Sequence, residues 1–177
     1  LMRLREICCD PRLVADNWDG GSAKLDACME LVTAAVEGGH RILLFSQFTS
    51  MLELLAKRLD EAGVSHFTLQ GSTPKPVRAE LVRRFNSGEA DVFLISLRAG
   101  GTGLNLTAAD IVIHYDPWWN VAAQNQATDR AYRIGQRNPV QVYKLIAQDT
   151  IEEKIVELQQ AKQDLAETVT GSADGAI

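Results

Sequence analysis

The residues best suited to chemistry lie in the segment QNQATDRAYRIGQ, residues 124–136, which we expect to form a helix. Gln126, Arg130 and Arg133 stand at i, i+4 and i+7, so a helix places one amide and two guanidinium groups on one face. An arginine stays charged and presents a rigid fork of donors to phosphate oxygens. Phosphoryl transfer needs such cations to stabilise charge on the transferred group. The alternative is a solvated face on which Asp129 pairs with Arg133.

A glycine-rich segment, SLRAGGTGLNL, follows an apolar run that we expect to be a strand at 92–95. Gly100, Gly101 and Gly103 would let backbone N–H groups approach a phosphate without a Cβ in the way. The segment is not a P-loop, because GxxxxGK[ST] occurs nowhere in the chain, and it lacks the third glycine of the dinucleotide fingerprint. A tight structural turn is the alternative interpretation.

Hydroxyl, amide and open backbone groups follow two further expected strands, at Ser46-Gln47 and at Gly71-Ser72-Thr73. Such groups contact sugar and phosphate without reading bases. Ordinary turn and capping chemistry is the alternative. Since ligands of parallel sheets bind beyond the carboxyl ends of the strands, these loops and the glycine-rich segment lie where a ligand is expected.

The composition allows one domain with a full core, because the chain has 177 residues, 46% of them hydrophobic and 23% charged. No apolar run has membrane-spanning length, and no signal peptide is recognisable. The net charge of -5 does not favour nucleic acid, so such binding needs local clusters of cations. Arginines supply these clusters: Arg78, Arg83, Arg84, Arg98, Arg130, Arg133 and Arg137.

The cysteines and acidic residues suggest no metal site in this chain. Cys8, Cys9 and Cys28 are odd in number and show no ligand spacing, so we expect reduced, structural thiols. The sequence DEAG at 60–63 resembles an ATPase acidic box, but the preceding LLAKRL belongs to an amphipathic helix rather than a buried strand. We therefore reject it as a Mg²⁺ site.

The expected elements alternate between strand and helix, which is the pattern of an α/β fold with a parallel sheet. Ser22 is expected to cap a helix, and Ser50 with Glu53 to form a capping box. The first helix should bury Leu1, Leu4, Ile7 and Cys8, and a later helix Val77, Leu81 and Phe85. The last helix, capped by Asp149 or Thr150, has a sparse apolar seam that needs a partner surface: Ile151, Ile155, Leu158 and Leu165.

Taken in order, these pieces resemble the second RecA-like lobe of the Snf-family (SWI/SNF-type) DNA translocases of helicase superfamily two. The matching segments are LREICCDPRLV, SAKLD, RILLFSQFTSML, LQGSTPKPVRAELVRRFN, VFLISLRAGGTGLNLTAADIVIHYDPWWN, QATDRAYRIGQ and VYKLIAQDTIEEKIVELQ. The resemblance implies a RecA-like parallel sheet with helices on both faces and a C-terminal brace helix. It divides the chain into an inter-lobe helix and loop (1–20), the lobe (21–147), the brace helix (148–171) and a disordered tail (172–177).

The resemblance also implies roles at the matching positions. Arg130 and Arg133 would act as arginine fingers, and Gly103, Asn105 and Gln126 are expected to face the nucleotide. Trp119 would match a tryptophan that approaches the minor groove. The residues expected near DNA are Ser46, Gln47, Phe48, Gly71, Ser72, Thr73, Arg98, Ala99, Gly100, Gly101 and Trp119.

These residues amount to half of an ATP site, because the chain has no Walker A lysine and no Mg²⁺-binding acidic pair. We expect ATP with Mg²⁺ as cofactor, with the Mg²⁺ ligands on a preceding lobe, so that the isolated chain is inactive. Because the chain begins Leu1-Met2 within an expected helix, we expect it to be a fragment of a longer protein.

The expected partners are the N-terminal RecA-like lobe of the same polypeptide, double-stranded DNA and a DNA-bound protein, with no membrane. The short loops and the DPWWN wording resemble bacterial members, which implies a cytoplasmic, nucleoid-associated protein, or a nuclear one in a eukaryote. Two alternatives stay open. One is a RecA-like scaffold that acts as a protein-binding module, motivated by the net charge and the sparse seam; the other is an RNA helicase lobe.

Overall fold

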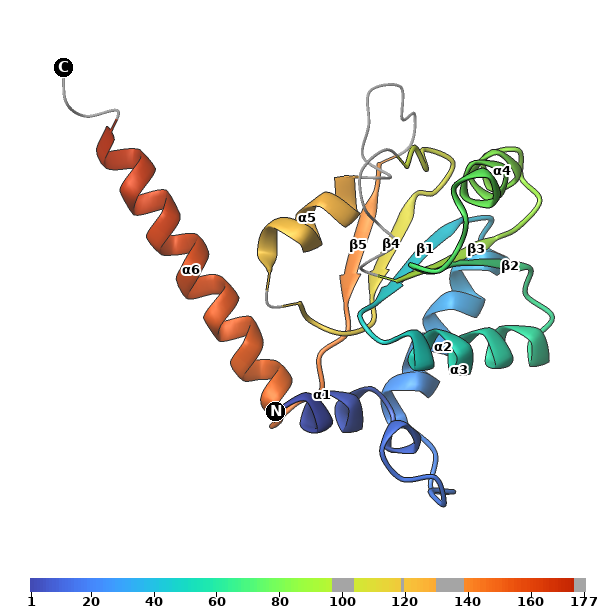
Figure 1. Ribbon diagram of the computed structural model, residues 1–177, viewed down its shortest axis with the longest axis horizontal. Coiled ribbons are helices and arrows are strands. Elements are labelled where there is room, and N and C mark those ends of the chain that lie inside the picture. Colours follow the sequence, from blue (N-terminus) through green and yellow to red (C-terminus); the bar gives the residue numbers. More distant parts are fainter. Residues whose placement is uncertain (97–103, 119, 130–138, 174–177) are drawn as a thin grey trace.

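The computed structural model describes residues 1–96, 104–118, 120–129 and 139–173, and within them five parallel strands form one sheet (Figure 1). The order is β2-β3-β1-β4-β5, with β1 at Ile42–Ser46, β2 at His66–Leu69, β3 at Val92–Ser96, β4 at Ile111–His114 and β5 at Gln141–Lys144. Ile42 pairs with both Val92 and Ile111, so the strands start level. Their carboxyl ends therefore meet at one edge of the sheet.

Helices cover both faces of the sheet, as the sequence predicts. The core has two halves, one beneath α2 and α3 on one face of the sheet and the other beneath α4 and α5 on the opposite face. A short 3-10 turn, Pro11–Leu13, follows α1. The helices are α1 (Met2–Cys9), α2 (Ala23–Glu37), α3 (Thr49–Glu61), α4 (Lys75–Asn86), α5 (Val121–Asp129) and α6 (Ile151–Ala173).

The central strand β1 shows why the strands are continuously apolar. Ile42 and Leu44 pack into the core beneath α2 and α3, whereas Leu43 and Phe45 pack into the core beneath α4. Since both faces are covered, the alternation of polar and apolar residues that marks a half-exposed strand is absent. The edge strand β5 differs, because all four of its residues are exposed.

Two predicted helix caps are tested by the structure. Ser22 caps α2, and its Oγ accepts from the backbone N–H of Leu25 at 3.3 Å. The predicted capping box of Ser50 and Glu53 is wrong, because α3 begins at Thr49 with Phe48 as its cap residue. The hydroxyl of Ser46 instead accepts from the N–H of Phe48 at 3.1 Å, so the end of the strand organises the start of the helix.

The outer helices bury faces that the sequence pattern did not indicate. In α1, Leu1, Leu4 and Ile7 are exposed, and Arg5 and Cys9 are buried instead. In α4, Phe85 is buried as predicted but Val77 is exposed. Periodicity finds an apolar stripe but does not tell which surface covers it.

The last helix, α6, ends at Ala173, two residues beyond the predicted limit of 171. Thr150 Oγ1 accepts from the N–H of Glu152 at 3.1 Å, as the capping prediction expected. Ile155 is buried, but Leu158 and Leu165 are exposed, while the polar Glu152 and Gln159 are buried. The predicted seam is therefore covered in part at Ile151, covered at Ile155 and uncovered at Leu158 and Leu165.

Among the described residues, no helix is long and apolar enough to cross a membrane. The same residues hold no cluster of three or more histidine, cysteine or acidic side chains that could bind a metal ion. Cys9 and Cys28 are buried free thiols, and burial raises the pKa of Cys28 to about 12. A thiol with so high a pKa is a packing residue rather than a nucleophile.

Candidate nucleic-acid interface

A polar groove lies at the carboxyl edge of the sheet, between the ends of β1, β2 and β3. It is open and has a volume of about 400 Å³. Its lining combines the two loops that the sequence singled out with the last residue of β3, from which the glycine-rich segment continues: Gln47, Thr49, Gln70, Gly71, Ser72 and Ser96. The structure therefore brings the Ser46-Gln47 and Gly71-Ser72-Thr73 loops together.

Ser46 lies beneath this groove rather than in it. Its side chain is fully buried, and its Oγ donates to Asp116 Oδ1 at 2.5 Å. The other carboxylate oxygen of Asp116 accepts from the N–H of Gln47 at 3.2 Å. Burial raises the pKa of Asp116 to about 6, which these two hydrogen bonds oppose. The buried carboxyl thus fastens the loop after β1 to the loop after β4.

Gln47 faces the groove with both ends of its amide already engaged. Its Nε2 donates to the carbonyl oxygen of Pro117 at 2.8 Å, and its Oε1 accepts from Nη2 of Arg5. The guanidinium of Arg5 also lies 5.7 Å from the ring centre of Phe48. Phe48, expected near DNA, is half-buried against the core beneath α3.

The loop Gly71-Ser72-Thr73 is a tight turn held from within the chain. Thr73 Oγ1 accepts from the N–H of Gln70 at 3.0 Å, and the N–H of Thr73 donates to the carbonyl of Gln70 at 3.0 Å. Arg78 of α4 donates to the carbonyls of Thr73 at 2.8 Å and Gly71 at 3.0 Å. Gly71 and Ser72 stay exposed, so their backbone remains open to a ligand.

The arginines of α4 do not act as one basic patch. Arg78 holds the turn, Arg83 pairs with Glu80 at 2.7 Å and Arg84 pairs with Glu89 at 2.6 Å. The described part of the groove therefore offers mostly neutral donors and backbone groups. Local clustering of arginine, which the sequence suggested as compensation for the negative net charge, is not formed by α4.

Two residues expected to face the nucleotide lie away from this groove. Asn105 lies toward the amino edge of the sheet, where its carbonyl accepts from Nδ2 of Asn86 at 2.7 Å. The amino edge is identified by Arg41, which directly precedes β1 and donates to the carbonyl of Phe85, the neighbour of Asn86. Gln126 is exposed on α5. The other predicted site residues lie outside the described residues: Arg98, Ala99, Gly100, Gly101, Gly103, Trp119, Arg130 and Arg133.

The helix that leads to Arg130 is fixed by a buried histidine that the sequence analysis missed. His114, the last residue of β4, shares a hydrogen bond of 3.1 Å between its Nε2 and Thr128 Oγ1 of α5. Its ring also stacks on Phe45, with 5.6 Å between ring centres. Burial lowers the pKa of His114 to about 4, so the ring is neutral near pH 7. Nothing in the local sequence separates this histidine from an ordinary strand residue.

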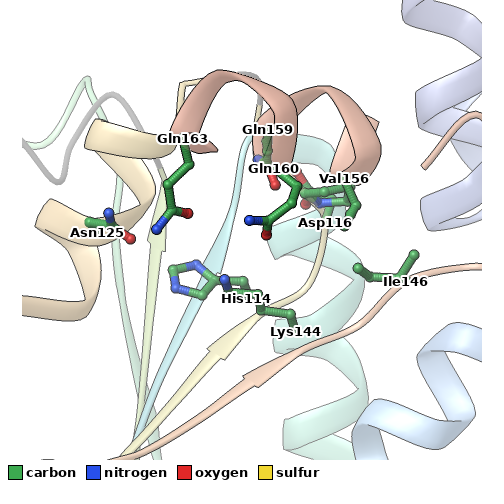
Figure 2. Close-up of a pocket in the computed structure, with 10 residues that line it drawn as sticks. His114, Asp116, Asn125, Lys144, Ile146, Val156, Gln159, Gln160 and Gln163 are labelled. Atoms are coloured by element: carbon green, nitrogen blue, oxygen red, sulfur yellow. The ribbon is translucent and has the colours of Figure 1, made fainter. Parts of the chain in front are cut away.

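A small polar cavity of about 90 Å³ lies over His114, between α5 and α6. Figure 2 shows Gln160 and Gln163 of α6 extending toward the His114 ring, with Asn125 of α5 on the other side. Nδ1 of His114 and Nε2 of Gln159 are buried there without a hydrogen-bond partner among the described residues. The space between α5 and α6 is therefore lined mostly by polar side chains.

A second feature that the sequence did not reveal is a buried ion pair at the start of α6. Lys24 of α2 pairs with Glu152 of α6, and their side chains are 7% and 1% exposed. Lys24 Nζ also donates to the carbonyls of Tyr115 at 2.9 Å and Leu145 at 3.1 Å. Glu152 accepts in addition from the N–H of Ala147 at 2.8 Å. This pair joins α2, α6 and the carboxyl ends of β4 and β5.

Comparison with known proteins places these observations in a family. Residues 23–135 match the model of the helicase conserved C-terminal domain. The chain is 44% identical over 178 residues to a putative ATP-dependent helicase/translocase, YwqA, of Bacillus subtilis (strain 168), which covers 97% of this chain and 19% of that protein. It is 39% identical over 175 residues to the SWI/SNF-related matrix-associated actin-dependent regulator of chromatin subfamily A member 1 of Mus musculus, covering 92% of this chain and 17% of that protein.

A solved structure is also similar. The crystal structure of the C-terminal part of the Fun30 ATPase domain aligns with a TM-score of 0.75 and 34% sequence identity, covering 89% of this chain and 53% of that one. The chain spans 19% of the length of the first relative and 17% of the second, which is less than a fifth of each.

Proposed function

Because this chain belongs to the family of helicase conserved C-terminal domains, we propose that it is the second motor lobe of an ATP-dependent translocase that moves on double-stranded DNA. The relatives named as ATP-dependent helicases and remodelling ATPases support the use of ATP. Their names also support DNA and a first lobe of the same polypeptide as partners. A DNA-bound protein substrate and a bacterial, cytoplasmic location are further parts of this proposal.

The observation that carries the proposal is the polar groove at the carboxyl edge of the sheet. Neutral side chains and exposed backbone from two loops line it, with Gln47 on one side and Gly71 and Ser72 on the other. Groups of this kind suit the sugar-phosphate backbone and carry no base-reading pattern. We therefore assign Gln47, Gly71, Ser72 and Thr73 to the DNA backbone, and Ser46 and Phe48 to holding this loop in place.

The remaining roles rest on the motif match. Arg130 and Arg133 would stabilise charge on the transferred phosphoryl group, and Gly103, Asn105 and Gln126 would face the nucleotide. Residues 98–101 and Trp119 would complete the DNA contacts. ATP would bind with Mg²⁺, whose ligands would come from the first lobe. Such an arrangement couples closure of the lobes around ATP to alternate gripping of the DNA backbone.

The decisive experiment compares this chain alone with the polypeptide that contains both lobes. The isolated chain is expected to hydrolyse no ATP, and the two-lobe protein to hydrolyse ATP faster when duplex DNA is added. Arg130→Ala or Arg133→Ala should then reduce the rate of ATP hydrolysis by a factor of about 10³–10⁵. Near-normal turnover in both variants would overturn the arginine-finger role. Stimulation by RNA but not by duplex DNA would favour the RNA helicase alternative.

A further inference from the structure

The first helix contains a buried cation where its sequence pattern suggested leucines. Arg5 is 7% exposed, whereas Leu1, which caps the helix, and Leu4 within it are 65% and 54% exposed. Arginine is seldom buried unless its donors are paired, because desolvating a charge is costly. The burial of Arg5 in place of its leucine neighbours therefore indicates that its partners matter to the structure.

Two partners of Arg5 lie in the loop that contributes Gln47 to the groove. Nη2 of Arg5 donates to Oε1 of Gln47, which is 42 positions away, and its guanidinium lies 5.7 Å from the ring centre of Phe48. A cation over an aromatic ring is attracted to it, so Arg5 holds the start of α3 as well as the loop before it.

The hydrogen bonds of Gln47 hold its side-chain amide in a single orientation. The oxygen accepts from Arg5, while the nitrogen donates to the carbonyl of Pro117 at 2.8 Å, and an amide flip would lose both bonds. The backbone N–H of Gln47 is held by Asp116 at 3.2 Å. Of these anchors, Arg5 is the one that comes from α1, outside the sheet and its loops.

We propose that Arg5 is a positioning residue that fixes the side chain of Gln47 in the groove, where Gln47 contacts the DNA backbone. Binding of the DNA backbone is then coupled to the docking of α1. The proposal rests on the proposed function, because it assumes that the groove binds DNA. It predicts that the loss of Arg5 weakens the apparent affinity for DNA through Gln47, without a contact of its own to the phosphates.

The test uses the full-length protein, and it measures ATP hydrolysis against the concentration of a blunt DNA duplex. Arg5→Met keeps the length and packing of the side chain but removes its donors. It should raise the half-saturating DNA concentration by about tenfold, the usual effect of losing a charged hydrogen bond, and leave the rate at saturating DNA near that of the wild type. Arg3→Met, on the exposed side of the same helix, is the matched control and should leave both values unchanged.

A double-mutant cycle separates positioning from a general loss of structure. If Arg5 acts through Gln47, Arg5→Met adds little to the effect of Gln47→Ala, and Arg5→Lys restores part of the affinity. Equal half-saturating concentrations for Arg5→Met and Arg3→Met overturn the inference, and so do fully additive effects of Arg5→Met and Gln47→Ala. Should Arg5→Met unfold, Arg5→Lys carries the same test with a smaller shift of about threefold.

The two proposals fail in different ways. A wild-type protein whose hydrolysis does not respond to DNA overturns the proposed function, and the inference with it. A wild-type protein that responds normally, with an Arg5→Met variant that responds identically, overturns the inference alone.

Discussion

The buried pair of Lys24 and Glu152 allows a quantitative prediction about stability. Lys24→Met removes the cation but leaves the Glu152 carboxylate, 1% exposed, with the N–H of Ala147 as its remaining donor among the described residues. The carbonyls of Tyr115 and Leu145 also lose their bonds to Nζ. Breaking a buried pair in this way costs about 3–5 kcal/mol of unfolding free energy. For a chain of this size the melting temperature should fall by about 6–20 °C.

The assay is equilibrium unfolding in urea, followed by circular dichroism, with the melting temperature as a second measure. Lys154→Met is the matched control, because Lys154 pairs with Glu157 on the same helix with both side chains about two-thirds exposed. Such a surface pair contributes little, so this variant should stay within about 0.5 kcal/mol of the wild type.

A double variant distinguishes a lost ion pair from lost packing. Lys24→Met combined with Glu152→Leu removes both charges, so the penalty for an unpaired buried charge disappears and most of the stability should return. The reasoning is refuted if Lys24→Met is as stable as Lys154→Met, or if the double variant is no more stable than the single one.

Three further predictions concern residues near the end of β4. Thr128→Val removes the hydrogen bond between His114 and α5, the helix that precedes Arg130, and should slow DNA-stimulated ATP hydrolysis by the two-lobe protein about fivefold in steady-state kinetics. Thr128→Ser keeps the hydroxyl and should leave this rate unchanged. Burial raises the pKa of Asp116 to about 6, so its ionisation destabilises the fold as pH rises from about 4 to 6; in urea unfolding, the unfolding free energy of the wild type minus that of Asp116→Asn should fall by about 3 kcal/mol over this range. Burial lowers the pKa of His114 to about 4, so protonation of its ring destabilises the fold as pH drops from about 6.5 to 4 and opposes the Asp116 effect in the wild type; the unfolding free energy of the wild type minus that of His114→Gln should fall by about 3 kcal/mol over this range in the same titration.

Much of the sheet could be predicted from sequence, because parallel strands that are buried on both faces consist of short continuous runs of apolar residues. The match to the helicase conserved C-terminal domain and to Snf-type relatives confirms the resemblance drawn from the motifs. The strand order is not local information, since β1 lies between β3 and β4 although β2 follows it in the chain. The cap of α2, in contrast, depends only on neighbouring residues, because Ser22 accepts from the backbone N–H of Leu25 in the first turn of the helix, so the sequence predicts it.

The errors have a common physical origin in contacts between distant residues. The start of α3 was misplaced because Ser46 is held by Asp116, 70 positions away, and in turn holds Phe48. The pair of Lys24 and Glu152 spans 128 positions and leaves no periodic trace. The grouping of Gln47 with Gly71 and Ser72, by contrast, followed from the rule that parallel strands end at one edge. The same rule says nothing about Asn105, whose carbonyl accepts from Asn86 at the end of α4, and its role toward the nucleotide stays a prediction.

The attachment of α6 at one end has a mechanical consequence. Glu152 and Ile155 are buried at its base, whereas every described residue from 160 to 170 is exposed, and Figure 1 shows the helix extending away from the sheet. A helix of 23 residues is about 34 Å long, so a tilt of about 10° at the base would displace its tip by about 6 Å. A spectroscopic label at Val169 would therefore be displaced much further than the base by any tilt of the helix, so it would report small rearrangements there.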